Sequence, residues 1–362
     1  MATRRGFIAG LIAAGLVPKR SWADAGSPSY LAAARQPDGL FSLIGLDSYG
    51  AEAFRVPLPG RGHAAAAHPT RPEAVAFARR PGTFALVIDC ATGQLKARLD
   101  SAEGHHFYGH GAFSRDGSLL FTSENAYETA TGMIGIWDVT AGYRRIGAFK
   151  SHGIGPHDIR LMPGAETLAV ANGGIETHPD SGRAKLNLPT MRPNLSFLSF
   201  TGEVLDQVEP DPALHLNSIR HLALRGDGTV GFAMQWQGDT SMAPPLLGLR
   251  RPDGTVQYLQ APDAPHRAME RYAGSVSFCA DGTLLGITSP RGGQVQVFQA
   301  ETGDYAGSYW ADDVCGLSDG PAGFMTTSGT GDVDAVAITT REWRVRHTDG
   351  FDNHLVRITP TL

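Results

Sequence analysis

The stretch at residues 109–142, GHGAFSRDGSLLFTSENAYETATGMIGIWDVTAG, decides the fold class of this chain. It contains three strand-like runs, at 112–113, 118–122 and 133–139, separated by an Asp116-Gly117 turn and a polar loop. Period-two apolar patterning bounded by Gly and Asp is typical of strands, and Trp137-Asp138 is the dipeptide that closes the third strand of many propeller blades. One such unit cannot bury both of its faces, so we expect further copies along the chain.

Turns equivalent to Asp116-Gly117 recur at intervals close to the roughly 40 to 50 residues of a four-stranded blade. They predict seven inner strands, at 63–68, 110–115, 157–162, 221–226, 275–280, 313–318 and 354–359. The last of these comes from the C-terminus, whereas the run that begins at Tyr30 opens the first blade without an inner strand of its own. We therefore predict an all-β fold, a seven-bladed β-propeller of the WD40/YVTN type, whose ring is closed by the C-terminal strand. Closure removes the sheet edges that would otherwise invite aggregation.

Composition agrees with this fold class. The chain has 362 residues, 42% of them hydrophobic, with 45 Gly and 23 Pro, which suits many short strands joined by many turns. No long segment shows sustained helical periodicity, and no run of 18 apolar residues follows the N-terminal region. The sequence thus predicts one propeller domain at 26–362 and no membrane span in the mature chain.

The N-terminus has the pattern of an export signal. Thr3-Arg4-Arg5-Gly6-Phe7-Ile8 resembles the twin-arginine motif, and it is followed by a weakly apolar run at 7–17 and a small-residue exit at Ala23-Asp24-Ala25. We expect residues 1–25 to be a twin-arginine signal peptide and the protein to be periplasmic. Cleavage would remove four basic residues and one acid, which changes the formal net charge from −5 to −8. A mildly acidic protein is not expected to bind nucleic acid.

The three cysteines, Cys90, Cys279 and Cys315, form neither CxxC nor CxxCH. This excludes a haem c motif, a thioredoxin-like centre and a cysteine-based zinc site. We expect three small buried thiols, with Cys279 and Cys315 as the pair to test for a disulfide.

One position of the repeats is occupied by histidine in most of the units. Six residues before each turn residue, five of the seven units have histidine, namely His63, His110, His157, His221 and His354. Inner strands line the channel of a propeller, so these side chains should converge on the channel mouth. Imidazoles gathered at one place suit Zn, Cu, Fe or Ni, and we expect His110, His157 and His221 to form the core of a metal site. The alternative is a structural Gly-His pair that bonds an Asp of its own blade, but such a histidine usually lies further upstream of the turn.

Other residues are candidates for the second shell or the channel entrance. The other two repeats place Ser275 and Asp313 at the ring position. His106, His152 and Arg220 lie within a few residues of a ring histidine, and His178 lies in a long loop that could reach the channel. The long polar segment at 172–194 could fold over the channel as a lid carrying Glu176, His178, Arg183 and Lys185, or be a solvated loop with no role.

Several motifs together resemble a known but uncharacterised family. They are GHGAFSRDG, SHGIGPHDIRLMPG, VANGGIETHPDSGRAKLNLPTM, SIRHLAL, TSPRGG and FDNHLVRI, with the twin-arginine-like start. The family consists of exported periplasmic seven-bladed propeller proteins, catalogued only as a domain of unknown function. Its members are commonly encoded beside imelysin-like iron-uptake proteins and a dihaem oxidoreductase-like protein. The resemblance implies a role in periplasmic iron handling, with such proteins as partners, and it supplies no catalytic residues.

Three hypotheses of different classes follow. The first is a periplasmic metal-binding propeller that assists iron (or copper) acquisition, with the five histidines as ligands. The second is a lactonase-like hydrolase in which a ring histidine acts as general base beside a divalent ion. Gly153-Ile154-Gly155-Pro156-His157 weakly resembles the Gly-Pro-Arg-His motif of propeller lactonases, although the arginine is missing. The third is a scaffold whose rim binds a partner protein.

Overall fold

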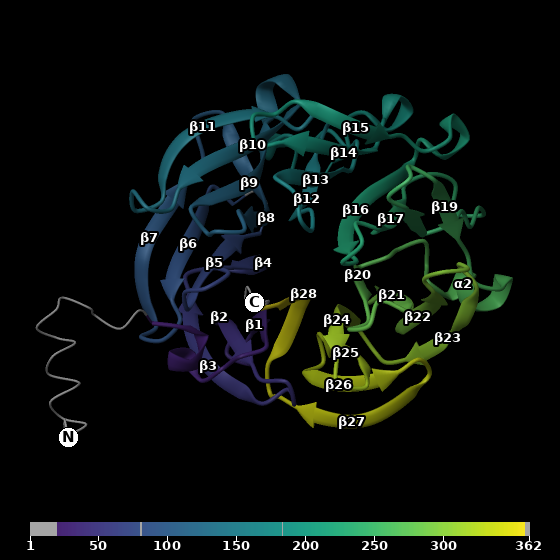
Figure 1. Ribbon diagram of the computed structural model, residues 1–362. Coiled ribbons are helices and arrows are strands. Elements are labelled where there is room, and N and C mark those ends of the chain that lie inside the picture. The colour runs from purple at the N-terminus through teal and green to yellow at the C-terminus, as the bar shows by residue number, and fades with distance from the viewer. Residues whose placement is uncertain (1–19, 80–81, 183, 359–362) are drawn as a thin grey trace, which may run out of the picture.

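The protein is a closed ring of small antiparallel sheets (Figure 1). The computed structural model describes residues 20–79, 82–182 and 184–358, so the twin-arginine motif at Arg4-Arg5 lies outside the described residues. Within these ranges, 28 strands form seven four-stranded sheets, and α2 (Asp263–Ala268) is the one α-helix. The predicted seven-bladed β-propeller is therefore confirmed. Five short 3-10 helices complete the described elements: η1 (Trp22–Ala25), η2 (Tyr127–Thr129), η3 (Pro179–Ser181), η4 (Leu188–Thr190) and η5 (Pro212–Leu214).

Each blade runs from an inner strand at the axis to an outer strand at the rim. The first blade has the order β28 (Gly350–Arg357), β1 (Tyr30–Arg35), β2 (Phe41–Leu46) and β3 (Glu52–Leu58). The next three blades consist of β4 (Gly62–Ala67), β5 (Glu73–Ala78), β6 (Phe84–Asp89), β7 (Gln94–Asp100); β8 (His105–Phe113), β9 (Leu119–Ala126), β10 (Thr131–Asp138), β11 (Arg144–Lys150); and β12 (Pro156–Leu161), β13 (Thr167–Asn172), β14 (Asn194–Ser199), β15 (Val204–Val208). The last three consist of β16 (Asn217–Leu224), β17 (Val230–Trp236), β18 (Leu247–Arg250), β19 (Val256–Leu259); β20 (Ser275–Phe278), β21 (Leu284–Ser289), β22 (Gln294–Gln299), β23 (Tyr305–Trp310); and β24 (Val314–Gly320), β25 (Gly323–Ser328), β26 (Asp332–Ala337), β27 (Thr340–Arg346).

The ring closes where the two ends of the chain meet. β28 pairs antiparallel with β1, with Tyr30 opposite Arg357 and Leu31 opposite Val356. Tyr30 is fully buried and donates its hydroxyl to the carbonyl of Asp319, 2.9 Å away at the end of β24. Closure by the C-terminal strand was predicted and is confirmed, and it leaves no inner strand unpaired on this side.

Burial changes from the axis to the rim of a blade. In the third blade β9 is buried along most of its length, whereas β11 alternates between exposed and half-buried residues, as expected for a strand with one solvated face. Trp137-Asp138 closes β10 as predicted, and Trp137 donates its Nε1 hydrogen to Thr122 Oγ1 at 2.9 Å. β8 begins at His105, earlier than the sequence pattern indicated.

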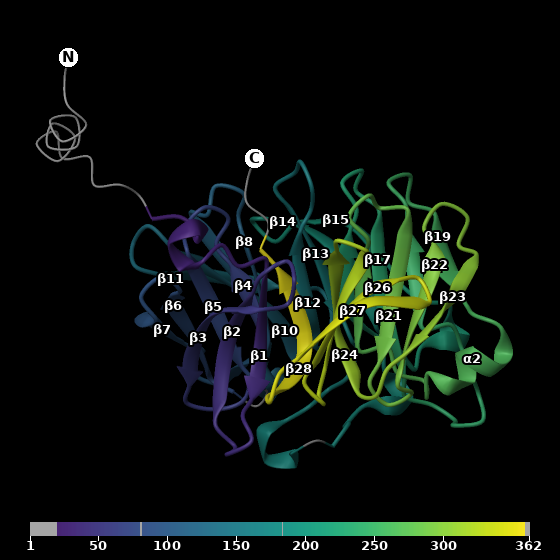
Figure 2. The same ribbon diagram turned by 90° about the horizontal axis from the view of Figure 1, so that it is seen from below.

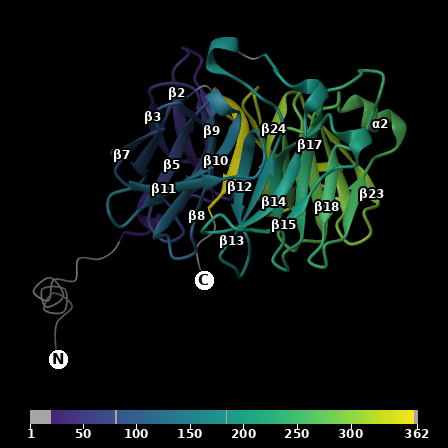
Figure 3. The same ribbon diagram turned by 90° about the horizontal axis from the view of Figure 1, so that it is seen from above.

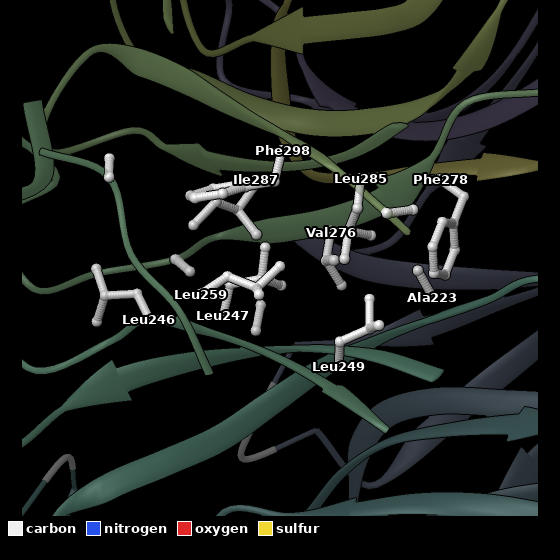
Figure 4. Close-up of a cluster of buried hydrophobic side chains, with 14 of the residues drawn as sticks. Ala223, Leu246, Leu247, Leu249, Leu259, Val276, Phe278, Leu285, Ile287 and Phe298 are labelled. Carbon is white, nitrogen blue, oxygen red and sulfur yellow. The ribbon is translucent and has the colours of Figure 1, made fainter. Parts of the chain in front are cut away.

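The hydrophobic core lies between neighbouring blades. Figure 4 shows one such layer, in which Leu247 and Leu249 of β18 face Leu285 and Ile287 of β21. Each of these four side chains is at most 1% exposed. Burying one aliphatic side chain stabilises the fold by about 1.5 to 3 kcal/mol. A blade thus depends on its neighbours for most of its stability, as the repeat argument required.

Six of the seven inner strands carry a β-bulge within the described residues. The register shifts at 62–65 of β4, 107–111 of β8, 156–158 of β12, 219–221 of β16, 314–316 of β24 and 351–355 of β28. β20 pairs with β21 without a shift. A bulge re-aims a side chain out of the regular alternation. Four of these bulges contain a ring histidine, and in β16 the regular pairing resumes at His221, opposite Ala233. The bulges thus help to turn these side chains toward one another.

The segment before the first strand packs against the propeller. Trp22 is 7% exposed and Ala25 5%, and both belong to the cluster formed with Leu31 and Leu43. Trp22 also donates its Nε1 hydrogen to the carbonyl of His68 at 2.9 Å. The signal-peptide boundary at residue 25 stays a prediction, and cleavage there would remove these contacts.

Two further expectations concern the state of the cysteines and the absence of a membrane span. Cys90, Cys279 and Cys315 are buried and free, so the expected buried thiols are confirmed and the Cys279–Cys315 pair is not bridged. No helix in the described part of the chain has the length and hydropathy needed to cross a bilayer.

Candidate metal centre

Five histidines from five inner strands meet at the axis of the propeller. They are His63 of β4, His110 of β8, His157 of β12, His221 of β16 and His354 of β28, and each is 3 to 7% exposed. Their ring centroids approach one another to between 4.7 and 5.9 Å. The structure thus brings together all five residues that the repeat spacing singled out, and it buries them rather than leaving them at an open mouth.

The five histidines form two overlapping groups that could hold a metal ion. One group is His63, His110 and His354, and the other is His110, His157 and His221. Within each group the ligand atoms lie within 4.8 Å of one another. Metal–nitrogen bonds of about 2.0 to 2.1 Å require nitrogens no more than about 4.2 Å apart, so small rotations of the imidazoles suffice. His110 belongs to both groups and is the residue on which the centre depends.

A buried carboxylate fixes the orientation of His110. His110 Nδ1 lies 3.2 Å from Asp158 Oδ1, and Asp158 also accepts the backbone N–H of Leu222 at 3.0 Å. Burial alone would raise the pKa of Asp158, but Arg160 and His110 outweigh burial and hold this pKa well below its usual value. Asp158 is therefore a carboxylate that can only accept, so His110 donates from Nδ1. Its Nε2 is left as the ligand atom, the arrangement in which an outer carboxylate orients a metal-binding histidine.

His157 is oriented in the same way by the main chain. Its Nδ1 donates to the carbonyl oxygen of Arg220 at 3.1 Å, which leaves Nε2 to act as ligand. Arg220, predicted to lie near the site, thus contacts the ring through its backbone carbonyl.

Four nitrogens of the ring are buried without a hydrogen-bond partner among the described residues: His63 Nδ1, His110 Nε2, His221 Nδ1 and His354 Nε2. Nearly all buried polar atoms in proteins have a partner, so four unpartnered nitrogens in one place call for a ligand. A cation bound by one of the two groups would satisfy the unpartnered nitrogens of that group.

Four of the ring histidines are held in the neutral form. Burial, with repulsion from neighbouring histidines and arginines second, lowers the pKa of His63, His157, His221 and His354 well below 6.5. Neutral imidazole is the form that binds metals, so these four side chains are ready for a metal at neutral pH without losing a proton.

A glycine makes room for the ring. Gly109 has φ +100°, and a Cβ built on it would lie 2.5 Å from His63 Cδ2. Only glycine allows the imidazole of His63 to rest against the β8 backbone here. The Gly109-His110 pair therefore has a packing function between two blades.

A pocket of about 340 Å³ opens beside the ring. His63, His157 and His221 line it, together with Ile175, Thr177 and Lys185 of the long segment at 172–194. Figures 2 and 3 show this segment running across one face of the propeller. The expected lid thus borders the site, while Arg183 lies outside the described residues.

The other predicted neighbours of the site lie elsewhere, and none of them lines this pocket in the described part of the chain. His106 stacks on Tyr127 with ring centroids 6.1 Å apart. His152 is exposed and reaches the carbonyl of Gly202, and His178 lies 3.5 Å from Glu128. Ser275 is buried at the start of β20.

Asp313 is displaced for a structural reason. In β24 the bulge falls on Cys315, so Asp313 precedes the strand with φ +50°. It lines a second pocket with Arg61 and Asp352. Counting residues back from a turn cannot show whether the chain bulges before or after the counted position.

Asp158 is the functional residue that the repeat alignment missed. The signal was present, because Asp158 directly follows His157, but its partner His110 belongs to the preceding blade. A repeat alignment compares equivalent positions and does not show contacts between them.

Comparisons with known proteins agree with this fold. The chain belongs to the family described as "Protein of unknown function (DUF1513)", which matches residues 56–358. No curated protein matches it in sequence. Among solved structures, it resembles a chain of the Kuenenia stuttgartiensis hydrazine synthase, with TM-score 0.61 and 13% identity over 89% of this chain and 96% of that one. It also resembles a chain of the mitotic checkpoint complex, with TM-score 0.55 and 12% identity over 79% and 80% of the two chains. At such identities the likeness concerns the fold alone.

Proposed function

We propose that this protein binds one transition metal ion in the histidine centre and serves iron (or copper) acquisition in the periplasm. The observation that carries the proposal is the pair of overlapping three-histidine groups, which share His110 and contain four buried nitrogens without a partner. All five candidate ligands are imidazoles, a donor set that suits Fe, Cu, Zn and Ni rather than Mg or Ca. Iron as cargo, and imelysin-like or dihaem oxidoreductase-like proteins as partners, are proposed from the family resemblance.

The shared histidine sets the number of ions. His110 Nδ1 is occupied by Asp158, so His110 has one ligand atom to give, and both groups need it. We therefore expect one ion per chain, bound by one group or the other.

Metal loading of purified protein tests the centre. Chelator-treated protein is titrated with Fe²⁺ under anaerobic conditions, and separately with Cu²⁺, Co²⁺ and Zn²⁺, and bound metal is measured by elemental analysis. Wild type should bind one equivalent, and His110→Ala should retain less than about a tenth of it at the same free metal concentration. His215→Ala, which changes a histidine outside the ring, is the control. Equal metal content in all three proteins would refute the metal centre.

The proposed compartment has its own test. The twin-arginine route reads both guanidinium groups, so Arg4→Lys with Arg5→Lys keeps the charge and should retain the protein in the cytoplasm. Cell fractionation measures this, and an unchanged periplasmic yield would contradict the route.

One observation favours hydrolysis as a second candidate. Three ring histidines line the pocket, so an ion bound there could keep an open position for substrate, as in catalytic zinc sites. The ion would polarise a lactone carbonyl and the chain would position the substrate. Lactone hydrolysis by metal-loaded wild type, absent in His110→Ala, would support this candidate, and no hydrolysis by either would remove it.

A further inference from the structure

The pocket beside the histidine centre is lined by positive charge. Four cationic side chains from four parts of the chain face it, namely Arg79, Lys185, Arg220 and Arg291, and no carboxylate is among its lining residues. Arg79 and Arg220 are half-buried near the ring, whereas Lys185 and Arg291 are exposed at the rim. The charge therefore extends from the rim to the histidines, although the whole chain is acidic.

Two of these cations, Lys185 and Arg291 at the rim, have uncharged partners. Arg79 lies 3.4 Å from Asp352, a residue of the adjoining pocket. At the rim, Arg291 stacks on Tyr272 at 4.4 Å and Lys185 donates to the amide oxygen of Gln237, and both of these partners are uncharged. Burial lowers the pKa of Lys185, and repulsion from Arg291 and Arg220 adds to it. An anion bound among these like charges would relieve their repulsion.

We infer that this pocket binds a small oxyanion carrying two or more carboxylate or phosphate groups. Guanidinium groups bind carboxylate and phosphate oxygens with two parallel hydrogen bonds, which matches the chemistry of Arg79, Arg220 and Arg291. Gln235, Gln237 and Asn353 line the same space and add amide donors. A volume of about 340 Å³ is that of a small-molecule site.

The anion site does not depend on the proposed metal. Its binding groups are the four cations, so metal-free protein should also bind the anion. Two sources of the ligand are compatible with this chemistry: a free anion, or an anionic chelate that brings the metal to the histidines. In the second case a histidine would take over the metal while the cations hold the carboxylates.

Calorimetric titration of metal-free protein with citrate, and separately with inorganic phosphate, tests the inference. Wild type should bind citrate saturably, with affinity that falls as salt rises. Lys185→Gln with Arg291→Gln should bind about tenfold more weakly or worse, because two rim charges are lost. Both residues are exposed, so the fold should be kept. The control is Arg144→Gln with Lys150→Gln, which removes two exposed charges from the outer strand β11.

Three outcomes would overturn the inference: no saturable binding of either anion by wild type, equal binding by the double variant, or an equal loss in the control. Comparing iron(III) citrate with citrate alone identifies the source. Tighter binding of the chelate that is lost in His110→Ala indicates delivery as a chelate, and equal binding indicates a free anion. Co²⁺ affinity measured in chloride buffer keeps the two proposals apart, because failure to bind Co²⁺ with citrate binding intact refutes the metal centre and leaves the anion site.

Discussion

At the scale of single residues, the proposed metal centre depends on two residues that are not ligands. Asp158 decides which nitrogen of His110 faces the ring, and Gly109 leaves the space into which His63 fits. Both act by position, so their replacement should affect metal binding more than it affects the fold.

Asp158→Asn should weaken metal binding by about 10- to 100-fold, the usual effect of losing a carboxylate behind a ligating histidine. An amide can donate as well as accept, so it no longer forces His110 to keep its proton on Nδ1. Co²⁺ titration followed by visible absorption measures the affinity. Asp334→Asn is the matched control, because Asp334 is equally buried but pairs with Arg344 and Tyr309 in another blade. If both variants lose the same affinity, Asp158 is only structural.

Gly109→Ala should reduce metal affinity and destabilise the fold by more than about 1 kcal/mol. The new Cβ would meet the His63 ring at 2.5 Å, in a backbone conformation with φ +100° that alanine rarely adopts. Gly142→Ala separates the two effects, because Gly142 has φ +73° and nothing within 4 Å of its added Cβ. The control should show the strain alone, with metal affinity unchanged. Equal metal affinity in Gly109→Ala and wild type would show that His63 is not a ligand.

At the scale of elements, the β-bulges explain both what the sequence predicted and what it did not. Repeat spacing was enough to find seven inner strands and five ring histidines, because each blade keeps its turn and its axial position. It counted Asp313 as a ring position, whereas Asp313 precedes β24 and the bulge of that strand falls on Cys315. It missed the contact of Asp158 with His110 of the preceding blade, because a repeat period carries no information about contacts between blades.

The element η1 provides the third prediction. A chain that begins at residue 26 should unfold more easily than one that begins at residue 20, by about 3 kcal/mol, because it lacks the buried Trp22 and the hydrogen bond of that indole to His68. Trp22→Ala in the longer chain should reproduce most of the loss. Urea unfolding of the three proteins measures it, and identical midpoints would show that η1 contributes nothing. Mass spectrometry of exported protein then shows which form the cell keeps.

At the scale of the whole molecule, the ring gathers side chains that no single blade could hold together. Five inner strands each contribute one imidazole, and closure by β28 brings His354 beside His63, with ring centroids 4.7 Å apart. Several imidazoles are therefore buried side by side, where their protonation is unfavourable. The free energy of unfolding should for this reason depend on pH.

Metal-free protein should lose stability as the pH falls below about 6.5. In the folded state the pKa values of His63, His157, His221 and His354 are held well below 6.5, mainly by burial. Above 6.5 these side chains are neutral in both states. Below pH 6.5 these histidines become protonated in the unfolded chain but stay neutral in the folded protein. The free energy of unfolding therefore falls by up to about 1.4 kcal/mol per pH unit for each histidine, until the pH reaches the pKa of that histidine in the folded state.

Urea unfolding between pH 7.5 and 5.5 measures this dependence, in a range above that in which most carboxylates titrate. His157→Gln with His221→Gln should reduce the slope to about half, because two of the four depressed groups are gone. His215→Gln, outside the ring, should leave the slope as in wild type.

Saturating metal should make the loaded protein more stable than the metal-free form at pH 7.5, and this gain in stability should decrease at lower pH because protons compete for the same nitrogens. If the free energy of unfolding is constant from pH 7.5 to 5.5, the ring histidines protonate as readily in the folded protein as in the unfolded chain. The histidine centre would then be more accessible to water than its burial indicates.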